Sequence, residues 1–113
     1  GAEHVSLSSD AFGSQPKFDA NGECIGLTYA SPKYLHKTVQ SLVRRGMPLT
    51  EALKPLTTTP AVLLAKEGCK GCICDGADAD LLVLDAELNI CSVFAKGKTA
   101  VLDGAVMMKG RFE

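Results

Sequence analysis

The chain has 113 residues, of which 46% are hydrophobic and 22% charged, and its formal net charge is -1. These shares are typical of an ordinary soluble globular protein. The near-neutral charge gives no reason to expect nucleic acid or a membrane surface as a partner, and the longest apolar runs fall far short of the roughly 20 residues that cross a bilayer. Five cysteines, an odd number, argue against a disulfide framework and predict a cytoplasmic location.

The first expected element is a strand over residues 5–8, where Val5 and Leu7 alternate with two serines. Asp10 falls just past its carboxyl end, which is where barrels of parallel strands carry their chemistry. A loop over residues 11–16 follows, and its glycine and proline favour a sharp turn close to a ligand. The pattern by itself leaves a second interpretation open, because Asp is also a common turn former.

A small hairpin is expected between Phe18 and Ile25. Asn21-Gly22 lies at its centre, and this pair readily supplies the positive φ angles of a two-residue turn. The sequence therefore predicts an antiparallel excursion between the loop and the first long helix.

The first long helix is expected to begin at Ser31-Pro32, a capping hydroxyl followed by a proline at the first helical position. Its apolar residues recur at i, i+4, i+7 and i+8, and a glycine ends it; these are Leu35, Val39, Leu42, Val43 and Gly46. Two further helices are expected to begin at Thr50 and Thr59, because each threonine precedes good helix formers or a proline.

After Gly68 the pattern changes to short apolar runs separated by turn residues, which is typical of an antiparallel sheet. The runs cover residues 81–84, 90–94, 99–102 and 105–108, and the turns are expected at Gly97-Lys98 and Asp103-Gly104. The sequence therefore predicts two domain segments, residues 1–66 and residues 67–113.

Several motifs, taken in chain order, resemble the isoaspartyl (beta-aspartyl) dipeptidases of the metal-dependent amidohydrolase superfamily. Ser8-Ser9-Asp10 with Gly13-Ser14-Gln15-Pro16 is similar to the last barrel strand and following loop of the isoaspartyl branch. Residues 55–61 resemble the superfamily's threonine-rich stretch, and residues 70–85 resemble its segment around Gly-x-Asp-Ala-Asp-Leu. Residues 93–98 and 103–113 resemble the closing strands, so the resemblance covers essentially the whole chain.

The resemblance implies an α/β fold. Residues 1–66 would hold the last strand and helix of a TIM-type (β/α)8 barrel, and residues 67–113 the carboxyl-terminal part of a small β-sandwich domain. A full barrel takes about 250 residues, so we expect the chain to be the carboxyl-terminal third of a larger hydrolase. We expect this fragment by itself to be inactive. The full-length enzyme is expected to form a homo-oligomer and to bind a dipeptide substrate.

The resemblance also assigns roles to two residues. In the full-length enzyme Asp10 would ligate one of two divalent metal ions, most often zinc, and would be the catalytic proton acceptor and donor. Ser14 would bind the substrate's free carboxylate. The family's histidine ligands and carboxylated lysine would lie on earlier strands, so we expect no metal in this fragment and structural or solvent roles for His4 and His36. Ala11 and Phe12 depart from the small polar residues or glycines usual there, which leaves the substrate preference open.

Alternatives remain at this stage. Cys69-x-x-Cys72-x-Cys74 with Cys91 supplies four thiols, enough for a tetrahedral zinc site, although a second Cys-x-x-Cys is missing. The resemblance instead places Cys72 and Cys74 on an ordinary strand. Asp78 and Asp80 are expected at a turn and a strand entry, because a calcium loop would need further ligands at fixed offsets that the sequence lacks. Another amidohydrolase, such as a cyclic amidase or deaminase, and a stand-alone structural or binding module are the competing functions.

Overall fold

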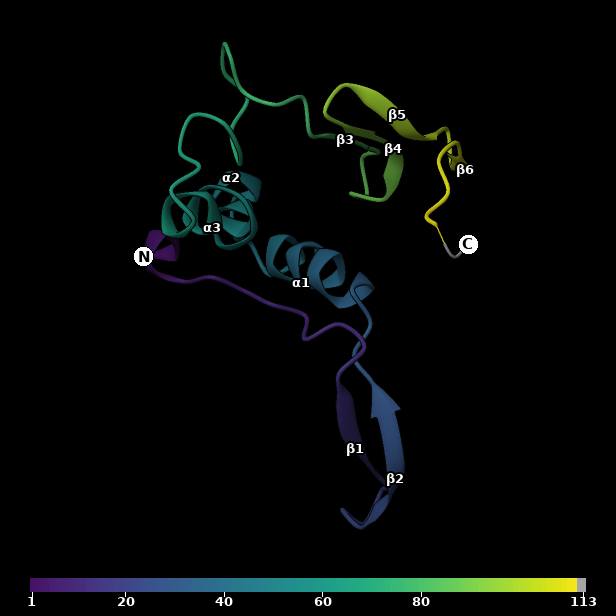
Figure 1. Cartoon of the computed structure of the whole chain (residues 1–113). Helices are drawn as coiled ribbons and strands as arrows, with labels where there is room; N and C mark the ends of the chain where they lie inside the picture. Colours follow the sequence, from purple (N-terminus) through teal and green to yellow (C-terminus); the bar gives the residue numbers. More distant parts are fainter. Residues whose placement is uncertain (112–113) are drawn as a thin grey trace.

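A computed structural model describes residues 1–111 and shows two antiparallel sheets joined by short helices (Figure 1). The hairpin projects away from the helices, and the larger sheet lies on their other side. In chain order the elements are η1 (Ala2–His4), β1 (Ser14–Phe18), β2 (Cys24–Tyr29), α1 (Lys33–Arg44), α2 (Leu49–Leu53), η2 (Lys54–Leu56), α3 (Thr58–Leu63), β3 (Leu81–Leu84), β4 (Ile90–Ala95), β5 (Lys98–Leu102) and β6 (Ala105–Val106).

The strand expected over residues 5–8 is not formed. Val5 has extended backbone angles, φ -122° and ψ 131°, but the segment joins neither sheet among the described residues. Its one backbone contact with a distant segment is the N–H of Leu7, which donates to the carbonyl of Pro55 at 3.1 Å. The alternation gave the right local conformation, yet a strand also needs a neighbouring strand to accept its ladder of hydrogen bonds.

The expected hairpin is confirmed as β1 and β2, but its turn is longer than the two residues predicted. Asp19 organises the turn: its carbonyl accepts the N–H of Gly22 at 3.1 Å, and its Oδ1 accepts the N–H of Asn21 at 2.8 Å. Gly22 adopts a positive φ of 85°, whereas Asn21 does not. The first strand already begins at Ser14, so the expected loop over residues 11–16 was also too long.

Helix α1 confirms the predicted apolar stripe and its glycine end. Val39 is 1% exposed, the most deeply buried of the stripe. Gly46 adopts φ 97°, its N–H donates to Val43 at 2.9 Å, and the next N–H, that of Met47, donates to Leu42 at 3.1 Å. These two bonds are the Schellman pattern, which satisfies carbonyls left free by the end of a helix.

The expected helix starts differ from the observed ones by one residue: Pro32 is the N-cap of α1, which begins at Lys33. Ser31 Oγ accepts the N–H of Lys33 at 3.4 Å, as expected at the start of α1. Thr50 and Thr59, however, lie inside α2 and α3 instead of preceding them. At α2 the carbonyl of Pro48 accepts the N–H groups of Glu51 and Ala52. The hydroxyl of buried Thr59 donates to Ala2 O at 3.4 Å.

Strands β3 to β6 form one four-stranded antiparallel sheet in sequence order, as the apolar runs predicted. The turn before β5 uses Lys96-Gly97, with φ 48° and 75°, one residue earlier than expected, because Lys98 already belongs to the strand. The turn at Asp103-Gly104 is confirmed, with φ 46° and 81°. Residues 107 and 108 fall outside β6.

The segment from residue 64 to residue 80 carries neither helix nor strand and joins α3 to β3. The domain boundary expected between residues 66 and 67 falls in this segment and stays a prediction. A contact across the two parts comes from α1: His36 Nε2 lies 2.6 Å from the carbonyl oxygen of Leu88 in the loop before β4.

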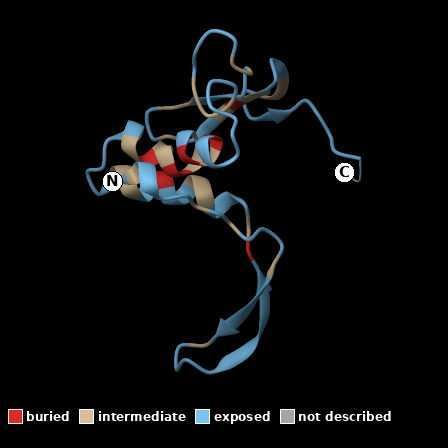
Figure 2. Ribbon diagram, turned by 60° about the vertical axis from the view of Figure 1, so that its left-hand side comes forward, coloured by how far each residue is buried: buried red, intermediate tan, exposed pale blue. Residues whose placement is uncertain are grey.

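Burial is sparse and concentrated in the helices (Figure 2). The buried hydrophobic residues are Ala30, Val39, Ala52 and Ala61. The radius of gyration is 16.4 Å, compared with about 13 Å for a compact domain of this length. Large apolar side chains of the hairpin, α3 and β3 are exposed, Leu27 by 75% and Leu63 by 71%. None of the helices within residues 1–111 has the length and apolarity that a membrane crossing requires.

Candidate functional site at the base of the hairpin

Asp10 lies at the start of a tight turn that leads into β1. Its backbone has a positive φ of 47°, and its carbonyl accepts the N–H of Gly13 at 2.9 Å. A Cβ atom at position 13 would lie 2.7 Å from Asp10 Oδ2. The carboxylate therefore folds back over the turn, and glycine is the residue that leaves room for it.

The turn is fixed to the end of β2 by a pair of backbone hydrogen bonds. The N–H of Phe12 donates to Ala30 O at 2.9 Å, and the N–H of Ala30 donates to Gly13 O at 3.2 Å. The ring of Phe12 stacks on that of Tyr29, with centroids 6.3 Å apart and planes at 18°. Phe12 adopts φ 64°, a conformation uncommon for a bulky residue, and the two bonds and the stacked ring hold it there.

Ser14 is the first residue of β1 and pairs with Tyr29 of β2. Its side chain is exposed. Within residues 1–111 neither the Ser14 hydroxyl nor the Asp10 carboxylate makes a hydrogen bond or ion pair to another side chain. The base of the hairpin thus presents one carboxylate, one hydroxyl and an aromatic pair, with both polar groups free to meet a ligand.

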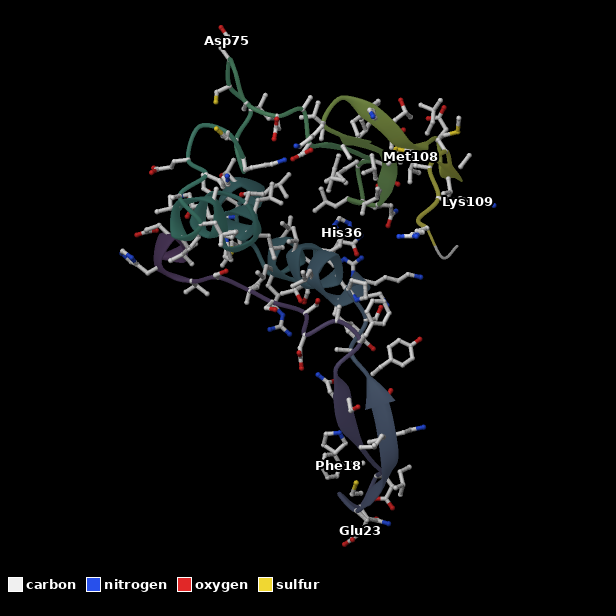
Figure 3. The ribbon with its side chains drawn as sticks, in the orientation of Figure 1. Phe18, Glu23, His36, Asp75, Met108 and Lys109 are labelled. Carbon is white, nitrogen blue, oxygen red and sulfur yellow. The ribbon has the colours of Figure 1, made fainter. Side chains whose placement is uncertain are left out.

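The two histidines do not join this site. His4 is 79% exposed and lies 3.6 Å from Glu3 Oε1, while His36 is engaged with the carbonyl of Leu88 (Figure 3). Both placements agree with the structural and solvent roles expected from the sequence. The described residues contain no group of three or more side chains able to hold a metal ion. Asp10 offers a carboxylate, a ligand type that divalent cations bind.

The cysteines do not form the four-thiol site considered above. Cys72 and Cys74 lie in the segment between α3 and β3, and the strand expected there is wrong. Gly71 and Gly76 have positive φ angles of 71° and 84° and bend the segment repeatedly. Cys91 lies apart on β4, and no metal-holding group exists among residues 1–111.

The sequence did not predict an ion-pair cluster at the foot of this segment, where its two ends, near residues 70 and 78–80, come together. Lys70 Nζ lies 2.8 Å from Asp78 Oδ2 and also contacts Asp80 Oδ2. These two bonds, to Asp78 first, raise the pKa of Lys70. Lys70 in turn lowers the pKa of Asp80, helped by the backbone N–H of Lys96 at 2.8 Å. Asp80 directly precedes β3, as expected, whereas Asp78 lies two residues after the turn at Asp75-Gly76. Their shared lysine gives both a structural role.

Known proteins that are similar to this chain show which family it resembles. No protein family model matches the chain. A solved beta-aspartyl dipeptidase of Fervidobacterium islandicum AW-1, in complex with a beta-Asp-Leu dipeptide, is 37% identical with a TM-score of 0.82 over 97% of this chain. The expected resemblance to the beta-aspartyl dipeptidases is confirmed.

A second beta-aspartyl dipeptidase structure from this organism is 32% identical over 99% of the chain, with a TM-score of 0.77. The chain spans only 29% and 26% of these two dipeptidases, as expected if it corresponds to one portion of such an enzyme. An N-acetylglucosamine-6-phosphate deacetylase from Pasteurella multocida shares the fold, with a TM-score of 0.64 and 19% identity over 88% of this chain and 30% of its own.

Proposed function

We propose that this chain is the carboxyl-terminal part of a binuclear metal-dependent dipeptidase that hydrolyses isoaspartyl peptide bonds. The observation that carries the proposal is the 37% identity to a beta-aspartyl dipeptidase over 97% of the chain. The exposed apolar side chains of α3 and β3 support it too, because large uncovered apolar patches mark surfaces that pack against other parts of a protein.

In the full-length enzyme the helical part would complete a (β/α)8 barrel and the sheet would belong to a β-sandwich domain. The uncovered Val5–Ser8 segment would then find its neighbouring strands in the rest of the barrel. A homo-oligomeric state and a cytoplasmic location stay predictions. The isolated fragment would be inactive, since it supplies a single candidate ligand to the metal centre.

Asp10 would hold one of the metal ions through its carboxylate. Bound metal, most often zinc, would supply Lewis acidity and an ionised water at neutral pH. Asp10 would transfer a proton: one carboxylate oxygen would accept the remaining proton of the ionised water during the attack and would pass it to the leaving amine. The free carboxylate and its tight turn support this role, because the turn holds the backbone of Asp10 while its carboxylate has no internal partner among the described residues.

Ser14 would bind the free carboxylate of the dipeptide. A hydroxyl that donates to a carboxylate makes a charge-assisted hydrogen bond, which is stronger than a neutral one. The stacked rings of Phe12 and Tyr29 lie beside Ser14 in the hairpin and would form an apolar wall next to the bound substrate.

The test uses the full-length enzyme, an isoaspartyl dipeptide and an analogue in which an amide replaces the free carboxylate. Asp10→Asn should lower kcat by at least about 10²–10⁴-fold, the usual contribution of proton transfer. Ser14→Ala should lower kcat/KM for the dipeptide by a factor equivalent to about 1.5–3 kcal/mol of transition-state stabilisation, the range for hydrogen bonds to charged groups. The decrease should be smaller for the analogue. Ser41→Ala, an exposed serine on α1 and outside the turn, is the control and should change neither.

Near-normal turnover of Asp10→Asn would remove Asp10 from the mechanism. A Ser14→Ala variant that loses thermal stability but keeps the ratio between the two substrates would assign Ser14 to the turn. Activity on a cyclic amide and none on the dipeptide would point to a different amidohydrolase.

A further inference from the structure

The segment between α3 and β3 brings two thiols together at its outer end. Cys72 Sγ and Cys74 Sγ lie 3.2 Å apart. Cys74 is exposed, and Ile73 between them is 90% exposed. Figure 3 shows the neighbouring Asp75 at the outermost point of this segment, away from the helices and the sheet. Cys72 is half-buried and Cys74 exposed, so within residues 1–111 the pair lies at the surface.

The two ends of the segment are bonded to each other, whereas its tip is held by a local turn bond from the N–H of Ala77 to Cys74 O at 3.2 Å. The N–H of Asp78 donates to Cys69 O at 2.9 Å, and Lys70 ties Asp78 and Asp80 together. At the tip, by contrast, Cys74 Sγ has a single long contact with Gly68 O, at 3.8 Å, besides its contact with Cys72. A disulfide bond is about 2.05 Å long, so the sulfurs need to approach by only about 1.2 Å, a shift that an exposed tip allows.

We propose that Cys72 and Cys74 form a redox-active dithiol that closes to an intramolecular disulfide by exchange with a low-molecular-weight disulfide such as glutathione disulfide. This activity goes beyond peptide hydrolysis and does not rest on it. The exposed tip places the product among the labile, readily reduced disulfides, which suit reversible regulation better than structural support.

The exchange has two steps. The thiolate of Cys74 attacks the small disulfide, forms a mixed disulfide and releases one small thiolate. Cys72 then loses its proton to solvent and its sulfur attacks Cys74 Sγ, which forms the protein disulfide and expels the second small thiolate. Two protein thiols are oxidised, and one small disulfide is reduced to two thiols.

Among the described residues, the sulfur–sulfur contact joins Cys72 to Cys74 and includes neither Cys69 nor Cys91. Cys91 lies on β4, where its Sγ contacts the carbonyl of Asn89 at 3.7 Å. Cys69 lies at the fixed foot, with its backbone carbonyl bound to Asp78. The hydrogen bond with Cys74 raises the pKa of Cys72, so ring closure, which needs the Cys72 thiolate, should become faster as the pH rises.

The experiment treats the full-length protein with glutathione disulfide, blocks the remaining thiols by alkylation and digests with trypsin and the endoprotease Asp-N. Cleavage after Lys70 and before Asp75 releases residues 71–74, which contain both cysteines and no other thiol. We expect this peptide to be unalkylated and two hydrogen atoms lighter than its reduced form. The Cys72→Ser and Cys74→Ser variants should instead carry glutathione on the remaining cysteine.

The control variants Cys69→Ser and Cys91→Ser should form the internal disulfide to the same extent as the natural chain. Three results would overturn the proposal: mixed disulfides on both cysteines without an internal bond, a disulfide that includes Cys69, or thiols in residues 71–74 that stay reduced. Dipeptidase activity measured in parallel tells the two proposals apart, because the mass of this peptide does not depend on hydrolysis.

Discussion

Gly71 offers a sharp test of how the segment between α3 and β3 is held. Its φ of 71° is in the left-handed region, where a residue with a side chain loses about 1–2 kcal/mol. A Cβ atom there would also overlap the carbonyl oxygen of Thr57, lying 2.6 Å from the carbonyl carbon and 3.1 Å from Ala61 Cβ. The backbone cannot rotate away as a flexible side chain can, so we add the usual cost of overpacking, about 1–3 kcal/mol.

Gly76 is the matched control for Gly71→Ala. It has a similar φ of 84°, but a Cβ atom added at this position would meet nothing within 4 Å. Gly76→Ala therefore carries the conformational cost without the overlap. The two variants should therefore differ in the free energy of local opening by about 1–3 kcal/mol, which corresponds to roughly a 5- to 140-fold difference in the equilibrium constant for opening.

Amide hydrogen exchange in the full-length protein measures this opening. The reporters are the N–H of Lys66, bound to Ala61 O at 2.8 Å, and that of Cys69, bound to Lys66 O at 3.0 Å. Exchange at both should be faster in Gly71→Ala than in Gly76→Ala by the stated factor. Equal exchange in the two variants would refute the close packing of Gly71 against Thr57.

Two further predictions concern the four-stranded sheet. Asp85 accepts hydrogen bonds from the side chain and backbone of Asn89 and from the N–H of Glu87, and these bonds lower the pKa of Asp85. The carboxylate therefore stabilises the fold at pH values above 3.8, its usual pKa. This stabilisation is lost as the pH falls through the lower pKa of the folded state. Asp85→Ala should lower the melting temperature at neutral pH, and the gap should close in acid; a gap that persists in acid would contradict this. Lys96→Asn should stabilise by up to about 1 kcal/mol in urea unfolding, because asparagine adopts the left-handed turn conformation more readily than lysine; a loss of stability would refute the turn assignment.

Elements whose signals are local could be predicted from the sequence alone. The apolar stripe around Val39 and the glycine at position 46 specified α1 and its end, because both act within a few residues along the chain. The runs that became β3 to β6 and the turn at Asp103-Gly104 were specified in the same way. The motif around Asp10 and Ser14 predicted a resemblance to the beta-aspartyl dipeptidases, and the solved structures confirm that resemblance.

Features that depend on distant residues emerge only in the folded chain. Val5 to Ser8 has the alternation of a strand, but no partner strand lies beside it among the described residues. The segment of Cys72 and Cys74 bends because Gly71 packs on Thr57, a contact that the sequence around the cysteines does not contain. The stacking of Phe12 on Tyr29 likewise needs the whole hairpin to bring the rings together. Periodicity and capping act between neighbours in sequence, whereas pairing, burial and stacking depend on where the chain returns in space.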